Sequence, residues 1–421
     1  MPEGADGVLA VMGSGETSPT MVTIHRALAG RLGPGHPPAV LLETPYGFQT
    51  NVADISATAC GYFARSVGLP VVTAPGLRGG DTEADRDRGL RLVRGAGWLF
   101  CGPGSPSYAL RQWHDDAVGA ALHDRFRSGT GLTVFASAAA ATLGRFTVPV
   151  YEVYKVGADP HWLDGLDVLS HLGLDVAVVP HYDNKEGGTH DTRYCYLGEQ
   201  RLRSMEEQLP PDVAVVGVDE HTAVVVDPGA DRVTVLGRGT LTVRHHGRSV
   251  VLPSGTALTM TELRDLCRRK PLTRTEVPAP AAPPGPAPAT LDQISAECEQ
   301  RFDKARDERD APGMTRAVLA LEAAVREWAA DTEEDIGVDQ ARAVLRTMIV
   351  RLGEAAAHGV AEPATVFRPV VEPLLALRAR LRAGRDYRTA DDLRDALAAA
   401  GIQLSDGPGG TSWSVTATAA G

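Results

Sequence analysis

Short apolar runs alternate with longer amphipathic stretches through the first 180 residues of the chain. Each run is five or six residues long, and stretches between them, such as residues 19–32 and 82–96, repeat apolar side chains at helical spacing. This alternation predicts βαβ units and a mainly parallel sheet sandwiched by helices. In such a sheet, functional residues gather at the carboxyl ends of the strands. The predicted strands are residues 8–12, 39–43, 70–74, 98–102, 132–136 and 175–180.

The hydrophobic pattern changes after residue 212. From Val213, short strands separated by Gly, Asp and Pro predict an antiparallel meander, a β extension that ends in a helix near residues 259–269. Residues 277–289 hold six prolines and five alanines, which favours an extended spacer over a helix or a sheet strand.

Beyond the spacer, apolar residues recur at helical spacing and predict a C-terminal α-helical domain with a short extended end at residues 411–415. We therefore expect an α/β domain at residues 1–272, a Pro/Ala-rich linker at 273–289 and a helical domain at 290–421.

Composition narrows the function classes. The 421 residues include 42 Lys and Arg against 53 Asp and Glu, and the net charge of −11 works against broad nonspecific nucleic-acid binding. The five cysteines form no CxxC pair, which argues against a disulfide framework and a zinc site. No signal peptide and no membrane-spanning stretch are recognisable, so we expect a cytoplasmic protein that needs no cofactor.

Three loops that follow predicted strands are candidates for one cleft: residues 13–19 (GSGETSP), residues 102–108 (GPGSPSY) and the junction at Ser137. Glycine-rich turns expose backbone N–H groups that suit an anion or an oxyanion. The first loop has Ser18 where a dinucleotide fingerprint needs its third glycine, so a structural turn is the simpler interpretation there.

Ser137 lies between a predicted strand and an alanine-rich helix, where a serine is most often a helix N-cap. Two downstream residues favour a catalytic interpretation. Glu152 follows fifteen residues later, and His181 comes directly after the strand at 175–180. A hydroxyl nucleophile needs a base to remove its proton and an acid to orient that base, and these three residues supply all three groups.

The order of glycine loop, serine turn, acidic residue, "PH" after the next strand and "VVGVDEHTAVVVD" resembles the dipeptidase E and cyanophycinase family of serine peptidases over residues 7–250. The resemblance implies a class-I glutamine amidotransferase-like, flavodoxin-like fold and hydrolysis of a peptide or related amide through an acyl-enzyme. It implies Ser137 as nucleophile, His181 as general base and Glu152 as orienting acid. It also implies an oxyanion hole from the backbone N–H groups of Ala138 and of Gly102 or Gly104.

The chain departs from the family at the serine turn. Phe135 and Ala139 stand where the family has glycines, and a Cβ at either position strains a tight turn by about 1 kcal/mol or more.

Residues 181–202 form the densest polar stretch. A metal site there is one interpretation of the His and Asp residues, and a loop over the cleft that recognises a charged substrate is the other, which we favour. The substrate-binding candidates from this loop and from the strand ends are Gly15, Glu16, Tyr46, Asn51, Asp183 and Arg193.

Residues 376–415 resemble the C-terminal end of cysteinyl-tRNA synthetases: a basic helix, the helix "ADDLRDALAAAGI" and a strand that contains "TSW". The catalytic motifs of those enzymes are not found, so amino-acid activation is not expected. The resemblance makes tRNA a candidate partner, while a solvated helix face is the alternative. The nucleic-acid candidates are Arg378, Arg382 and Arg385 within a cluster that also holds Arg380 and Arg388.

The sequence thus predicts a serine hydrolase acting on a small peptide or amide substrate through a Ser-His-Glu triad. The alternative is a catalytically impaired protein that recognises tRNA or an aminoacylated ligand through the synthetase-like tail. A homodimer is compatible with both.

Overall fold

The computed structural model describes residues 7–77, 82–114, 116–187, 190–269, 289–329, 335–358, 363–407 and 410–415. The chain forms two compact units, Met1–Leu291 with Val325–Asp339, and Asp292–Ala324 with Gln340–Gly421. The predicted linker at 273–289 lies outside the described residues, apart from Ala289.

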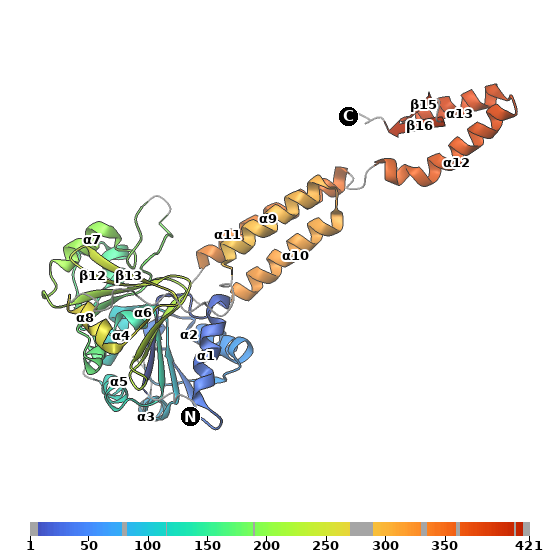
Figure 1. The fold of residues 1–421 in the computed structure, drawn as a ribbon. Helices are drawn as coiled ribbons and strands as arrows, with labels where there is room; N and C mark the ends of the chain where they lie inside the picture. The colour runs from blue at the N-terminus through green and yellow to red at the C-terminus, as the bar shows by residue number, and fades with distance from the viewer. Residues whose placement is uncertain are drawn as a thin grey trace. The chain divides into compact units, whose positions relative to one another are not determined.

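The first unit contains an eight-stranded sheet (Figure 1) in the order β14-β11-β10-β1-β5-β4-β2-β3. The five strands from β1 to β3 in this order pair in parallel, and β10, β11 and β14 add antiparallel to the β1 side. This confirms the predicted α/β class with a mainly parallel sheet and an antiparallel extension. The strands are β1 (Val8–Met12), β2 (Ala39–Leu42), β3 (Val71–Thr73), β4 (Trp98–Cys101), β5 (Leu132–Ala136), β10 (Thr222–Asp227), β11 (Arg232–Gly237) and β14 (Ala257–Leu258).

A second, six-stranded sheet has the order β13-β12-β9-β8-β6-β7. The strand predicted at 175–180 is β8 of this sheet, and β9 pairs with it in parallel. The region after Val213 is therefore not the single meander expected, because the chain passes between the two sheets and places β9, β12 and β13 here. The strands are β6 (Phe146–Thr147), β7 (Leu163–Asp164), β8 (Val176–Val179), β9 (Ala214–Val218), β12 (Thr240–His245) and β13 (Arg248–Pro253).

Both faces of the parallel strands β1, β2, β4 and β5 are buried, which explains why these strands are almost entirely apolar. On β1, Leu9 and Val11 face a core shared with α3, α4 and α5, whereas Val8, Ala10 and Met12 face α1 and α2. The helices of this unit are α1 (Val22–Ala29), α2 (Val52–Tyr62), α3 (Glu83–Gly95), α4 (Pro106–Trp113), α5 (Ala117–Ser128), α6 (Ser137–Ala141), α7 (Gly198–Glu206) and α8 (Met260–Cys267). Shorter helical turns lie at Pro19–Met21, Gly30–Leu32, Thr44–Tyr46, Phe63–Val67, Glu152–Val156 and Val168–Leu172.

The remaining helices, α9 to α13, lie after the predicted linker, and the second unit ends in a two-stranded hairpin. The extended end predicted at 411–415 is part of this hairpin. None of the helices in the described part of the chain combines the length and apolar character needed to cross a bilayer. The elements are α9 (Leu291–Asp307), α10 (Ala311–Trp328), α11 (Asp335–His358), α12 (Pro363–Ala383), α13 (Tyr387–Ala399), β15 (Ile402–Gly407) and β16 (Gly410–Val415).

A buried ionic cluster fastens α7 to β12. The guanidinium of Arg244, with 4% of its side chain exposed, donates to Glu206 at 2.9 Å and to both oxygens of Glu199 at 2.9 and 3.0 Å. Hydrogen bonds from Arg244 lower the pKa of Glu199 to about 2. Because α7 follows directly on residues 190–197, this cluster holds the polar loop in place.

We predict that Arg244→Ala destabilises the first unit by about 3–5 kcal/mol, because it leaves the carboxylate of Glu206 buried without its cation. Arg203→Ala is the matched control: Arg203 also pairs with Glu199, but 65% of its side chain is exposed, so its loss should cost less than about 1 kcal/mol. Urea unfolding measures both, and equal losses would contradict a special role for the buried pair.

Candidate active site

Ser137 is the first residue of α6, directly after β5, and its backbone has a φ of +47°. The left-handed region costs a residue with a Cβ about 1–2 kcal/mol, so the surroundings must hold it there. One such restraint is the hydrogen bond from the Ala139 N–H to the carbonyl of Gly102, at 3.2 Å. The turn therefore connects the ends of the neighbouring strands β4 and β5.

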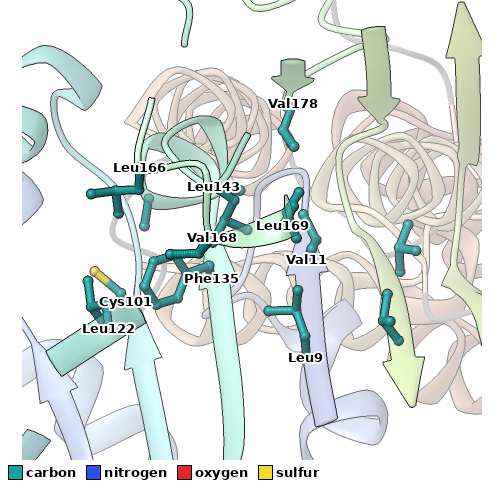
Figure 2. Packing of buried hydrophobic residues seen from close by; sticks show 14 of the residues in the cluster. Leu9, Val11, Cys101, Leu122, Phe135, Leu143, Leu166, Val168, Leu169 and Val178 are labelled. Carbon is teal, nitrogen blue, oxygen red and sulfur yellow. The ribbon is translucent and has the colours of Figure 1, made fainter. Parts of the chain in front are cut away.

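Phe135 and Ala139, which stand where the family described above has glycines, both have side chains buried inside the protein. Phe135 is fully buried on β5, with ring centroids 6.2 Å from Trp113 and 6.4 Å from Phe126. Figure 2 shows its ring within the buried hydrophobic cluster that also includes Val168. The side chain of Phe135 belongs to the core below the turn, and Ala139 is equally buried.

The hydroxyl of Ser137 lies 3.0 Å from Nε2 of His181, and Nδ1 of the same ring lies 3.0 Å from Oε1 of Glu220. A carboxylate only accepts, so the Nδ1–H of a neutral His181 donates to Glu220 and leaves Nε2 free to accept the serine proton. Burial would raise the pKa of Glu220, but the hydrogen bonds from His181 and Asn184, and the positive charge of His181 when it is protonated, outweigh burial and lower that pKa.

Glu152, the acid predicted from the sequence, does not contact His181 in this way. It lies in the turn Glu152–Val156, and its carboxylate accepts a hydrogen bond from the hydroxyl of Ser107 at 2.8 Å. Glu220 takes the predicted position because β9 runs parallel to β8, so the loops after both strands open at the same edge. The adjacent acids in "VDEHTAVV" at the end of a strand were the signal that could have identified it.

The backbone of His181 is also strained and restrained. Its φ is +47°, and its carbonyl accepts hydrogen bonds from the N–H groups of Asn184 and Cys195 at 3.2 and 3.1 Å. Cys195 is the middle of three consecutive residues with positive φ, Tyr194 to Tyr196. This left-handed turn, fastened through α7 to Arg244, fixes the loop from which the imidazole projects.

The serine and the imidazole open into a cleft of about 540 Å³, a size that suits a small peptide or a similar ligand. Its lining includes the polar side chains of Ser14, Gln49 and Asn51 and the aromatic rings of Tyr151, Tyr154 and Tyr196. Lys155 also lines the cleft, with its ammonium 4.9 Å from the centre of the Tyr154 ring.

The predicted substrate contacts divide into two groups. Tyr46 and Asn51 line the cleft. Gly15, Glu16, Asp183 and Arg193 are not among its lining residues.

Three residues of the second group make contacts elsewhere in the protein. Glu16 is fully buried, Asp183 accepts the backbone N–H of Glu220 at 2.8 Å, and Arg193 forms a two-pronged pair with Asp191 at 2.8 Å for each bond. The carboxylate partner of Arg193 thus belongs to the protein.

Of the predicted oxyanion donors, Gly104 and Ala138 line the cleft. Gly102 is not among the lining residues, and its carbonyl is the acceptor for Ala139. Gly104 has a φ of +130°, and a Cβ there would come within 2.2 Å of the Pro45 carbonyl oxygen, so only glycine fits. The geometry favours Ala138 with Gly104 as the pair of N–H donors.

Two of the three arginine candidates in the second unit, Arg378 and Arg382, bind the hairpin. The guanidinium of Arg378, on a side chain with 2% exposed, donates to both oxygens of Asp406 at 2.8 and 2.9 Å, and Arg382 donates to the same carboxylate at 2.8 Å. Arg385 is exposed in the turn between α12 and α13. Arg378 is therefore corrected from a nucleic-acid candidate to a structural residue, because its charge is buried and paired.

Among the described residues, no group of three or more His, Cys, Asp or Glu side chains is arranged to hold a metal ion. The cysteines at positions 60, 101, 195, 267 and 298 are all free thiols.

Comparisons with known proteins found relatives that match only part of the chain, and no protein-family model matches it. A cysteine-tRNA ligase of Micrococcus luteus is 35% identical over 144 residues, 32% of this chain and 28% of the ligase. A second, from Geobacter metallireducens, is 53% identical over 45 residues, 11% of this chain and 9% of the ligase. The chain thus spans less than a third of the length of these relatives. A solved peptidase from an acI-B1 actinobacterium is similar at 19% identity and a TM-score of 0.48, over 60% of this chain and 97% of that one.

Asp219, next to the acid of the site, gives a pH prediction. Its burial and the charge of Asp183 raise its pKa to about 6, although Thr240 hydrogen-bonds to it. When the pKa of a group is higher in the folded protein than in the unfolded chain, the group favours folding at a pH below its unfolded-state pKa. This stabilisation is lost as the pH rises through the folded-state pKa, here about 6. As the pH falls from 7 to 4, the stability of the wild type relative to Asp219→Asn should therefore rise by roughly 2–3 kcal/mol.

Urea unfolding of both proteins at pH 7, 6, 5 and 4 measures this difference. A difference that stays constant over the whole range would contradict a raised pKa for Asp219.

Proposed function

We propose that this chain is a serine hydrolase that cleaves a peptide or related amide bond through an acyl-enzyme. The observation that supports this best is the continuous hydrogen-bonded chain from the Ser137 hydroxyl through His181 to Glu220, with all three residues lining one cleft. A serine used only as an N-cap would direct its hydroxyl to a backbone N–H, and the Ser137 hydroxyl instead lies against an imidazole nitrogen.

In the first half of the reaction, Ser137 Oγ attacks the substrate carbonyl carbon while its proton passes to Nε2 of His181. Negative charge develops on the carbonyl oxygen, where the N–H groups of Ala138 and Gly104 would stabilise it. His181 then gives its proton to the leaving nitrogen, the carbon–nitrogen bond breaks and the amine departs. The acyl group remains as an ester on Ser137.

In the second half, water takes the place of the amine. His181 removes a proton from the water as its oxygen attacks the ester carbon, and then returns that proton to Ser137 Oγ, which releases the acid. Glu220 stays ionised throughout and holds the Nδ1–H tautomer. The mixture of polar and aromatic side chains that lines the cleft suits a short peptide, which has both amide groups and apolar side chains.

We predict that Ser137 reacts with a fluorophosphonate probe and that Ser137→Ala abolishes this labelling. Glu220→Gln should slow labelling by at least about 100-fold, because the amide cannot hold the correct tautomer of His181. Glu152→Gln is the matched control and should label within about threefold of wild type, since Glu152 contacts Ser107. Mass spectrometry of the labelled peptide measures the rate.

Equal labelling of wild type and Ser137→Ala would refute the nucleophile. Equal slowing by the two glutamine variants would refute the choice of acid.

We also propose that the second unit contacts tRNA, a role that suits either an active hydrolase or a binding protein in which turnover has been lost. The support is the similarity to cysteine-tRNA ligases, together with the exposed side chains of Arg380, Arg385, Arg388 and Tyr387 around the turn from α12 to α13. Clustered arginines with an exposed aromatic ring are typical of contacts to phosphates and unstacked bases.

We predict that the full chain binds bulk tRNA in a salt-dependent manner and that the triple variant Arg380→Gln, Arg385→Gln, Arg388→Gln reduces the slope of log K against log salt by about 2–3. The control replaces Arg316, Arg342 and Arg346, exposed arginines on α10 and α11, by Gln and should leave the slope unchanged. Gel shifts at several salt concentrations test this, and equal effects of both triple variants would show only nonspecific attraction.

A further inference from the structure

Glu220 is held by more than its contact with His181. The side-chain amide of Asn184 donates to Oε1 of Glu220 at 2.9 Å, the same oxygen that faces His181 Nδ1. The backbone N–H of Glu220 donates to Oδ1 of Asp183 at 2.8 Å. Two successive residues therefore hold Glu220 in place: Asp183 accepts a hydrogen bond from its backbone, and Asn184 donates one to its carboxylate.

The orientation of the Asn184 amide is fixed by its own surroundings. The residue is 1% exposed, and its Oδ1 accepts the backbone N–H of Glu186 at 3.2 Å. Because Oδ1 of Asn184 already accepts this hydrogen bond, the NH₂ group of the same amide faces Glu220. A carboxylate oxygen can be paired only with a donor, and the NH₂ group supplies one. The backbone N–H of Asn184 donates to the carbonyl of His181, which connects the same residue to the base.

We infer that Asn184 is a positioning residue that directs the Glu220 carboxylate toward His181 and keeps it ionised. Its effect on catalysis rests on the proposed hydrolase function, whereas its effect on the His181–Glu220 hydrogen bond does not.

Glu220 needs this restraint because its carboxylate is largely buried, and a buried charge with too few hydrogen-bond donors is energetically unfavourable. A buried acceptor that loses one hydrogen-bond donor is destabilised, and the carboxylate can then rotate or take up a proton. The charged and titratable groups around Glu220 are His181, Asp183, Asp219 and His221. Asn184 is uncharged, so its restraint does not change with pH.

Three variants of the full chain test the inference. Asn184→Ala removes the donor, and Asn184→Asp keeps the shape and the acceptor for Glu186 but sets an oxygen against Glu220. Lys185→Ala is the control, because Lys185 is the adjacent residue and is exposed. Circular dichroism and thermal melting establish that each variant is folded before it is compared.

We expect Asn184→Ala to slow fluorophosphonate labelling of Ser137 by about 10- to 100-fold and Lys185→Ala to stay within about twofold of wild type. At pH 8, Asn184→Asp should label as slowly as Asn184→Ala. As the pH falls, the labelling rate of Asn184→Asp should rise relative to that of Asn184→Ala. A proton shared by the two carboxylates restores a donor to Glu220, as happens in paired acids. A role in packing alone would not produce this pH-dependent recovery.

The proton on Nδ1 of His181 gives a readout independent of activity. Its low-field NMR resonance should shift or broaden in Asn184→Ala and remain unchanged in Lys185→Ala. An unchanged resonance together with wild-type labelling in both Asn184 variants would overturn the inference. If wild type itself is not labelled at any pH, the hydrolase proposal fails, and the resonance still decides the role of Asn184.

Discussion

The left-handed backbone at Ser137 is the constraint on which the site depends. A serine in ordinary helical or extended geometry at this junction would not place its hydroxyl at the same edge as His181. The strain of about 1–2 kcal/mol is held by buried neighbours on every side: the alanines of α6, Phe135 in the core and the hydrogen bond from Ala139 to Gly102. Packing of the hydrophobic core around the turn thus stabilises the left-handed backbone of Ser137.

The two sheets together supply the three groups. Ser137 follows β5 of the first sheet, whereas His181 and Glu220 follow β8 and β9, neighbouring parallel strands of the second. The distance between His181 and Glu220 is set by the pairing of β8 with β9 and by the hydrogen bonds of Glu220 with Asp183 and Asn184. The distance from the base to the hydroxyl depends on how β5 and β8 pack through α6.

Sequence patterns predicted the strands and the positions of Ser137 and His181 at strand ends, because each depends on local information: an apolar run followed by a polar residue at its carboxyl end. Glu220 was missed because its strand was interpreted as part of an antiparallel meander, in which strand ends alternate between edges. Only the parallel pairing of β9 with β8 places Glu220 beside His181, and that pairing is nonlocal. Arg378 was misjudged for a similar reason, since its partner Asp406 lies 28 residues further on in a hairpin.

The most direct measurement is a crystal structure of the chain after treatment with diisopropyl fluorophosphate. The proposed chemistry predicts phosphorus bonded to Ser137 Oγ, with one phosphoryl oxygen facing the N–H groups of Ala138 and Gly104 and His181 still bonded to Glu220. An unmodified Ser137 with its hydroxyl directed to a backbone N–H, and no imidazole within hydrogen-bond distance, would contradict the account.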